Sequence, residues 1–304
     1  MIYVIMHGRL GNQFFQYAFA KKMQSLRTND EIAIYFGRVQ KRNNEWTNDL
    51  IHFQTGKYKI EKNLYNIFRA MSFMQKCALI FYLIRCRFVS NQRKMDYQIQ
   101  SQTWLNKIGL YWLKNGEFVP VNSTQKNIFI CGHFEHYSFY TGMENQLRTF
   151  FSPKQPLCNW NVDLYKTICE TESVCISIRR GDYLTSANKS TYFLCDKEYF
   201  EKAISKMKEL VPNATFIFFS DDTDWIRENF KGENVYYESH NNPIWEKVRL
   251  MSACKHFIIS NSTFSWWNQY LSQNKGKIVV SPNRWKNGSS YKGLVSPNFT
   301  TIEV

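Results

Sequence analysis

The second half of the chain alternates strand-like and helix-like segments, and this pattern restricts the fold more than any other feature. Apolar, β-branched runs predict strands at residues 172–179, 214–220 and 256–260. Between them lie segments such as 196–210, in which apolar residues recur at the spacing of one helical face. Strands joined by crossover helices pair in parallel, so the pattern predicts a Rossmann-like domain over residues 158–304.

The first half begins in the same way and then loses its regularity. Strand-like runs occupy residues 1–6, 31–37 and 127–134, whereas residues 40–125 are irregular and rich in Lys, Arg and aromatic side chains. We therefore predict an α/β protein with a second, N-terminal α/β domain over residues 1–157 and a cleft between the two domains.

The charge of the chain indicates the chemistry of its partner. A formal net charge of +14 over 304 residues predicts an anionic partner, which can be nucleic acid, anionic lipid or a phosphate-bearing substrate. The eight cysteines form no CxxC pair, which argues against a zinc site and favours free thiols in a reducing compartment. The chain begins directly with a strand-like run, so we predict no signal peptide.

The longest apolar run, CALIFYLI at residues 77–84, is too short to span a bilayer. Lys and Arg residues surround it, and two interpretations follow. The favoured one is a helix that packs against the core. The other is a helix that rests on an anionic membrane surface.

Four polar clusters follow predicted strands, where ligands bind in α/β sheets. The first is GRLGNQFFQYAF at residues 8–19, in which two glycines flank a tight turn and Asn12 and Gln13 offer amide groups. The segment is neither a P-loop nor a GxGxxG motif. Its glycines could also serve the turn alone.

The second cluster places two arginines and Asp182 after a strand, in the sequence ISIRRGDY. An arginine fork matches phosphate oxygens, and Asp182 could orient an arginine or act as a base. The alternative is a structural Arg–Asp pair.

The third cluster, FFSDDTDW at residues 218–225, contains the D-x-D pattern of metal-dependent sugar-nucleotide enzymes, but its aspartates could equally cap the next helix. In the fourth, IISNSTFSWW at residues 258–267, hydroxyls stand at a predicted helix N-terminus, which favours anion binding over plain capping. Together the clusters predict a diphosphate held between an arginine and a helix N-terminus, as a sugar nucleotide would be.

These motifs occur in the order found in the α-1,2-fucosyltransferases of glycosyltransferase family 11, which the chain resembles from about residue 5 to about residue 285. GHFEHYSFY at residues 132–140 also resembles a motif of that family. The resemblance implies a GT-B architecture, GDP-fucose as donor, inversion at the anomeric carbon, and neither a metal nor another cofactor. By implication Arg179 binds the donor diphosphate, Asp221 and Asp222 lie near the nucleoside, and the N-terminal motif lies near the donor sugar and acceptor.

Three positions depart from the family pattern. Ser177 stands where the family usually has His, and Lys247 stands where it commonly has an acid, which leaves Glu246 as the candidate to read guanine. Glu135 replaces the usual Gln in the mid-chain motif and becomes a second, weaker candidate base. The predicted catalytic residues are Arg179, Asp182 and Asn12. The predicted donor-binding residues are Gly11, Gln13, Ser177, Arg180, Asp221, Asp222, Glu246, Asn261, Ser262, Thr263 and Ser265, and the predicted acceptor residues are His7 and Glu135.

The resulting hypothesis is transfer of fucose from GDP-fucose to the 2-hydroxyl of a galactoside. The acceptor is expected to be an oligosaccharide, which could be carried on a lipid pyrophosphate, and no nucleic acid is expected. A cytoplasmic enzyme, peripheral at the inner membrane, fits this hypothesis. The alternatives are transfer from another GDP-sugar or, from a different class, binding of an anionic surface or nucleic acid.

Overall fold

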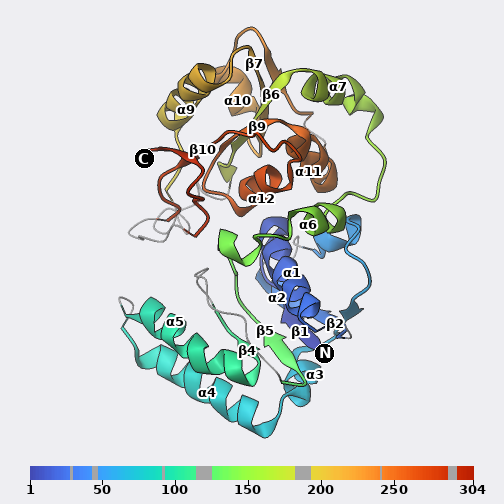
Figure 1. Cartoon of the computed structure of the whole chain (residues 1–304), viewed down its shortest axis with the longest axis vertical. Helices are drawn as coiled ribbons and strands as arrows, with labels where there is room; N and C mark the ends of the chain where they lie inside the picture. Colours follow the sequence, from blue (N-terminus) through green and yellow to red (C-terminus); the bar gives the residue numbers. More distant parts are fainter. Residues whose placement is uncertain are drawn as a thin grey trace. The chain divides into compact units, whose positions relative to one another are not determined.

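The computed structural model describes residues 1–27, 30–42, 47–90, 93–113, 125–181, 193–239, 242–286 and 293–304. The chain divides into two compact units (Figure 1). Unit 1 contains residues 1–51 and 55–143, and unit 2 contains residues 52–54 and 144–304. Each unit is built on a parallel β-sheet that carries helices, so the predicted α/β class with two Rossmann-like units is confirmed.

Unit 1 has a five-stranded sheet in the order β3-β2-β1-β5-β4, in which all neighbouring strands are parallel. The central strand β1 is nearly all apolar because helices cover such sheets on both faces. The strands and helices of this unit are β1 (Ile2–Ile5), α1 (Leu10–Ser25), β2 (Ile32–Tyr35), α2 (Gly37–Arg42), η1 (Asp49–His52), β3 (Lys59–Ile60), α3 (Leu64–Ala70), α4 (Phe73–Phe88), α5 (Lys94–Leu105), η2 (Asn106–Ile108), β4 (Leu110–Tyr111), β5 (Ile128–Ile130) and η3 (Tyr137–Phe139).

The segment predicted to be irregular holds three helices and two sheet strands of unit 1. Helices α4 and α5 lie side by side (Figure 1), and they share an apolar cluster with β1, β4 and β5. This cluster includes Leu79 and Tyr82 of α4 and Phe129 of β5. Strands β3 and β4 are two residues long, which is too short to produce an alternating pattern in the sequence.

Unit 2 has a six-stranded parallel sheet in the order β11-β10-β9-β6-β7-β8. Its elements follow the predicted alternation, with the short edge strand β11 as an addition. They are α6 (Glu144–Phe150), η4 (Asn159–Asn161), α7 (Val162–Glu170), β6 (Glu172–Ile178), α9 (Lys197–Leu210), β7 (Ala214–Ser220), α10 (Thr223–Asn229), β8 (Val235–Tyr237), α11 (Ile244–Ala253), β9 (His256–Ile259), α12 (Thr263–Leu271), β10 (Val279–Pro282) and β11 (Thr300–Ile302).

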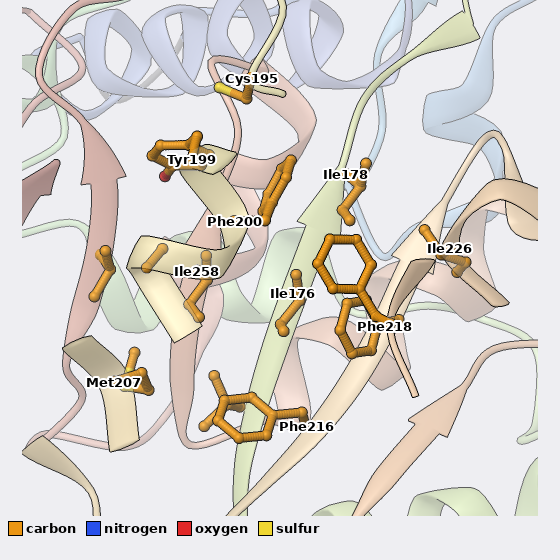
Figure 2. Close-up of a cluster of buried hydrophobic side chains, with 14 of the residues drawn as sticks. Ile176, Ile178, Cys195, Tyr199, Phe200, Met207, Phe216, Phe218, Ile226 and Ile258 are labelled. Carbon is orange, nitrogen blue, oxygen red and sulfur yellow. The ribbon is translucent and has the colours of Figure 1, made fainter. Parts of the chain in front are cut away.

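Helix α9 covers one face of the unit 2 sheet and forms a large apolar core with it. Figure 2 shows Phe200 and Met207 of this helix beside Ile176 of β6 and Ile258 of β9. All four side chains are buried. The helix has the predicted apolar stripe, and this stripe fixes the sheet whose upper strand ends carry the polar clusters.

The division between the units falls at residues 143 and 144, earlier than the predicted boundary at 157 and 158. Helix α6 belongs to unit 2 because it packs against α12. The Arg148 guanidinium donates to the carbonyls of Leu271 at 3.1 Å and Ser272 at 2.9 Å. The Phe151 ring, just after α6, meets the Trp267 ring edge-on with centroids 5.2 Å apart.

Candidate active site

The arginine pair and the aspartate pair face each other because β6 and β7 are parallel and in register to their last residues. One residue beyond the paired strands, Arg179 Nη1 lies 2.6 Å from Asp221 Oδ2. Next along the chain, Arg180 Nε lies 3.0 Å from Asp222 Oδ2. The backbone N–H of Arg180 also donates to Asp221 at 2.9 Å. The register of two neighbouring strands thus joins the second and third sequence clusters.

The two arginines have different surroundings. The guanidinium of Arg180 stacks on the Trp225 ring, 3.9 Å from its centroid, and the Arg180 side chain is 15% exposed. Asp222, its partner, also accepts a hydrogen bond from the backbone N–H of Trp225 and caps α10. Arg180 and Asp222 therefore fix the β7–α10 turn, and the capping alternative holds for Asp222. This leaves Arg179 as the better candidate for an anionic ligand.

The N-terminus of α12 lies beside the Arg179 strand, since β9 and β6 are neighbours in the sheet. Ser262 occupies the N-cap position of this helix but makes no side-chain cap hydrogen bond. Plain capping is thus not its role here, and Thr263 begins the helix directly after it. The positive end of the helix dipole and Arg179 stand at the same edge of one sheet, as an anion site requires.

Asn261 and Ser265, also predicted to bind donor, are engaged inside the protein. The Asn261 amide is buried and donates to the carbonyls of Phe193 and Trp285, both at 3.1 Å. It shapes the loop before α12 rather than facing a ligand. Ser265 lies 2.6 Å from Ser177 between their hydroxyl oxygens, and both residues are buried. Ser177, at the position where the family usually has His, therefore ties β6 to α12.

Glu246 does not have the surroundings of a guanine-binding residue. It is fully buried, and its Oε1 accepts hydrogen bonds from the backbone of Cys158 at 2.9 Å and from the Asn161 amide at 3.0 Å. Its Oε2 pairs with Arg249 at 3.0 Å. This carboxylate anchors the segment before α7, because the side chain leaves α11 on its buried face. The expectation for Glu246 is corrected accordingly.

The residue beside it, Lys247, leads to a carboxylate that the sequence analysis did not single out. Lys247 Nζ lies 2.9 Å from Oε1 of Glu238, which follows β8 and is fully buried. The same oxygen accepts the backbone N–H of Ser220 at 3.0 Å, directly before the aspartate pair. Burial raises the pKa of Glu238, and Lys247 acts in the opposite direction. The only signal in the sequence was the acid that ends ENVYYE, which periodicity cannot distinguish from a solvent-exposed one.

In unit 1, the turn after β1 is held by two glutamines of α1. Gln13 donates to the carbonyls of Gly8 at 3.1 Å and Thr47 at 2.8 Å. Its side-chain oxygen accepts the backbone N–H of Asp49 at 3.1 Å. Gln13 is fully buried, so it does not present its amide to a ligand as predicted. Gln16, one helical turn on, holds both backbone groups of His7.

This turn leaves Asn12 and His7 partly exposed at the end of the central strand, whereas Gly11 is buried. Gly8 has φ +72°, and a Cβ there would lie 2.4 Å from Asn12 Nδ2. A glycine is therefore required for Asn12 to stand against the backbone. The conformational alternative for this glycine and the placement of a polar amide at the turn are both realised.

The ends of β1 and β5 bring together a polar cluster. His7 Nε2 lies 3.3 Å from the Cys131 sulfur, which Arg38 also contacts at 3.6 Å. His133 Nδ1 lies 3.9 Å from Oε1 of Glu135, and Glu135 is 6% exposed. The predicted acceptor residues His7 and Glu135 thus occur at adjacent strand ends. Cys131, Arg38 and His133 are additions to the prediction.

The candidate base Asp182 lies outside the described residues. Among the residues that the structure describes, no group of three or more His, Cys, Asp or Glu side chains is arranged to hold a metal ion. Asp222 of the D-x-D pattern is committed to Arg180 and to the helix cap. Metal independence stays a prediction.

Comparison with known proteins identifies the relatives of this chain. The family model described as glycosyl transferase family 11 matches residues 1–293. The O-antigen biosynthesis glycosyltransferase WbnK of Escherichia coli is 27% identical, with 99% of this chain and 100% of that protein covered. The α-1,2-colitosyltransferase of Escherichia coli is 28% identical, with 91% and 90% covered. The structure also resembles the α-1,6-fucosyltransferase NodZ, at 13% identity and a TM-score of 0.49, with 89% of this chain and 92% of that chain covered.

Proposed function

The chain belongs to glycosyl transferase family 11, and from that premise we propose that it transfers L-fucose with inversion from GDP-β-L-fucose to the 2-hydroxyl of a galactoside. The galactoside would be part of a surface glycan, because a similar protein is named for O-antigen biosynthesis. The family fixes the enzyme class as a glycosyltransferase, while the donor and the acceptor are the content of the proposal.

One observation carries the proposal. Arg179 and the uncapped N-terminus of α12 stand at the carboxyl ends of β6 and β9, which are neighbours in one parallel sheet. A guanidinium has five N–H donors, so the contact of Arg179 with Asp221 is compatible with a second anion. The diphosphate of a sugar nucleotide is an anion of the right kind for a site of this composition.

The same groups would serve the reaction. Breaking the bond between the sugar and the phosphate places negative charge on the GDP leaving group. Preorganised donors at the diphosphate stabilise that charge as it develops, and this is where Arg179 and the first turn of α12 act. The acceptor hydroxyl loses a proton as it attacks the anomeric carbon, so a base near the acceptor assists. Asp182 remains our first candidate for that base, with Glu135 as the weaker one.

We place the acceptor in unit 1, at the ends of β1 and β5. Asn12, His7 and Glu135 offer amide, imidazole and carboxylate groups that can hydrogen-bond sugar hydroxyls. The acceptor could be carried on a lipid pyrophosphate, which would also use the positive charge of the chain. We propose no nucleic-acid partner, and we propose a cytoplasmic enzyme that is peripheral at the inner membrane.

A second donor is a specific alternative. A similar protein is named as an α-1,2-colitosyltransferase, so the sugar that is transferred can differ among relatives of this chain. Ser177 and Lys247 depart from the family pattern in the donor-side unit, which is a further reason to test other GDP-sugars.

The test is a transfer and hydrolysis assay with GDP-fucose and a panel of galactosides, in the presence of EDTA. We expect turnover with GDP-fucose that EDTA does not reduce. Turnover with a different GDP-sugar alone would replace the donor, and abolition by EDTA would overturn metal independence. If no donor turns over, GDP binding is compared for the wild type and Arg179→Met. Equal affinity of the two would refute the diphosphate site.

A further inference from the structure

Helix α4 has two apolar faces, and only one of them is covered by the rest of unit 1. The buried face is formed by Gln75, Leu79, Tyr82 and Cys86. The opposite face consists of apolar residues and a cysteine at helical spacing. It is formed by Phe73, Cys77, Ile80, Phe81, Ile84 and Phe88. We call this face the outer stripe of α4.

The outer stripe is strongly exposed. Phe73 is 83% and Phe88 is 84% exposed, and the residues between them are also exposed. A soluble monomer rarely exposes a contiguous apolar patch of this kind without a binding role. The expectation of a core-facing helix is therefore half correct, since it describes only the inner face.

Basic residues frame the outer stripe. Arg85 lies on one side of it, and Lys76 and Arg87 lie on the other, at a helical period of 3.6 residues. Residues 62–95 contain seven Lys or Arg and no Asp or Glu. An apolar stripe flanked by cations is the pattern of a helix that lies in a membrane interface, with its apolar side chains among the acyl chains and its cations at anionic headgroups.

The same features argue against the other occupants. Two copies of the chain that met through this face would bring their cations together at close range, which is unfavourable. A membrane crossing is also disfavoured. Within the described residues no single helix is long and apolar enough to span a bilayer, and α3 and α4, which pass such a test only as a pair, are bent by 119°. Helix α4 itself has 16 residues, or about 24 Å, and its inner face is held in the core of unit 1.

We propose that the outer stripe of α4, with its flanking Lys and Arg residues, docks unit 1 on an anionic membrane surface. The helix lies parallel to the surface, and Phe73 and Phe88 at its ends enter the lipid. This inference does not depend on the proposed reaction, because membrane docking is measured without turnover.

The chain carries a probe and a control for this proposal in its own cysteines. Cys77 lies in the outer stripe and is exposed, whereas Cys169 is exposed on α7 of unit 2. With Cys158 and one of the two replaced by Ser, an environment-sensitive fluorophore is attached to the other. Vesicles of phosphatidylcholine and phosphatidylglycerol should shift the emission of the Cys77 label to the blue and leave the Cys169 label unchanged. No shift at Cys77, or the same shift at both positions, would overturn the proposal.

Matched variants separate the apolar and the electrostatic contributions in a vesicle sedimentation assay. Phe81→Asp with Ile84→Asp should lower partition at least tenfold, whereas Leu26→Asp with Leu210→Asp, also at exposed apolar positions, should not. Lys76→Glu, Arg85→Glu and Arg87→Glu together should lower partition by about a hundredfold, at about fivefold per basic residue near the surface.

The control for the charge variant is Lys166→Glu, Lys231→Glu and Lys275→Glu, which changes net charge equally at exposed sites of unit 2. It should have a much smaller effect, because salt screens charges beyond about 10 Å. Equal losses in the two charge variants would overturn the surface assigned here. Dimerisation that depends on Phe81 and Ile84 without vesicle binding would assign the stripe to a second copy instead.

Discussion

Replacing Arg179 and Arg180 one at a time gives the most direct test of the donor site. The two residues are adjacent and chemically identical, but the structure gives them different tasks. Arg179 contacts Asp221 through Nη1 at 2.6 Å and stands beside the N-terminus of α12. Arg180 is held between Asp222 and the face of Trp225. We expect their substitution by Met to affect different quantities.

For Arg179→Met we expect kcat/KM for the donor to fall by about 10²–10³, as when one preorganised donor is removed from a developing oxyanion. This corresponds to about 2.7–4 kcal/mol of transition-state stabilisation. Arg179→Lys retains the charge but not the planar fork, so its loss should be intermediate. Stability should change little, because the Arg179 side chain is 20% exposed and its partner Asp221 is 26% exposed.

For Arg180→Met the expected order is reversed. The variant loses a stacking contact worth about 0.5–2 kcal/mol and a partly exposed ion pair, so unfolding in urea should show a loss of about 1–2 kcal/mol. Donor kcat/KM should remain within about fivefold of the wild type, or about 1 kcal/mol. Full activity in Arg179→Met, or an equal loss of activity in the two variants with intact folds, would refute the separate roles assigned to them.

Two further predictions concern buried charges. Lys247→Met strands the buried carboxylate of Glu238, so we expect a loss of about 3 kcal/mol near pH 7. The loss should shrink toward pH 5, where the raised pKa of Glu238 lets it protonate, and added Glu238→Gln should restore most of it. Urea unfolding at both pH values checks this, and a pH-independent loss would contradict it. Burial lowers the pKa of Lys277 to about 8, so the folded state binds this proton less tightly than the unfolded state. Lys277→Met should therefore stabilise the protein by about 1–2 kcal/mol near pH 7, with the gain disappearing above about pH 10, as thermal unfolding against pH would show.

The sequence predicted the elements whose pattern extends over a full strand or helix. Strand β6 and helix α9 have apolar runs or stripes long enough to identify them, and both were found. Strands β3 and β4 have two residues each and leave no periodicity to detect. The α4 helix shows a different difficulty. Both of its faces are apolar, so its composition predicts a helix without indicating which face is buried.

The candidate site was predictable only to the level of strand ends. The four clusters do occur at the carboxyl ends of parallel strands, since sheet topology alone decides this. The direction of a polar side chain is decided by partners far away in the chain. Gln13 is satisfied by residues 47–49, and Glu246 by residues 158 and 161. Sequence proximity to a motif therefore overestimated the number of side chains available to a ligand.

The departures from the family pattern have a physical explanation in the structure of unit 2. Ser177 has a polar partner in Ser265, and Lys247 has one in Glu238, and each pair joins elements that are separated in sequence. A buried polar residue that appeared without a partner would cost stability, because its hydrogen-bonding groups would be left unsatisfied. Here each departure is compensated within the fold, so the donor-side unit has been rearranged and not simply disrupted. The choice among GDP-sugars should for this reason be measured before the choice among acceptors.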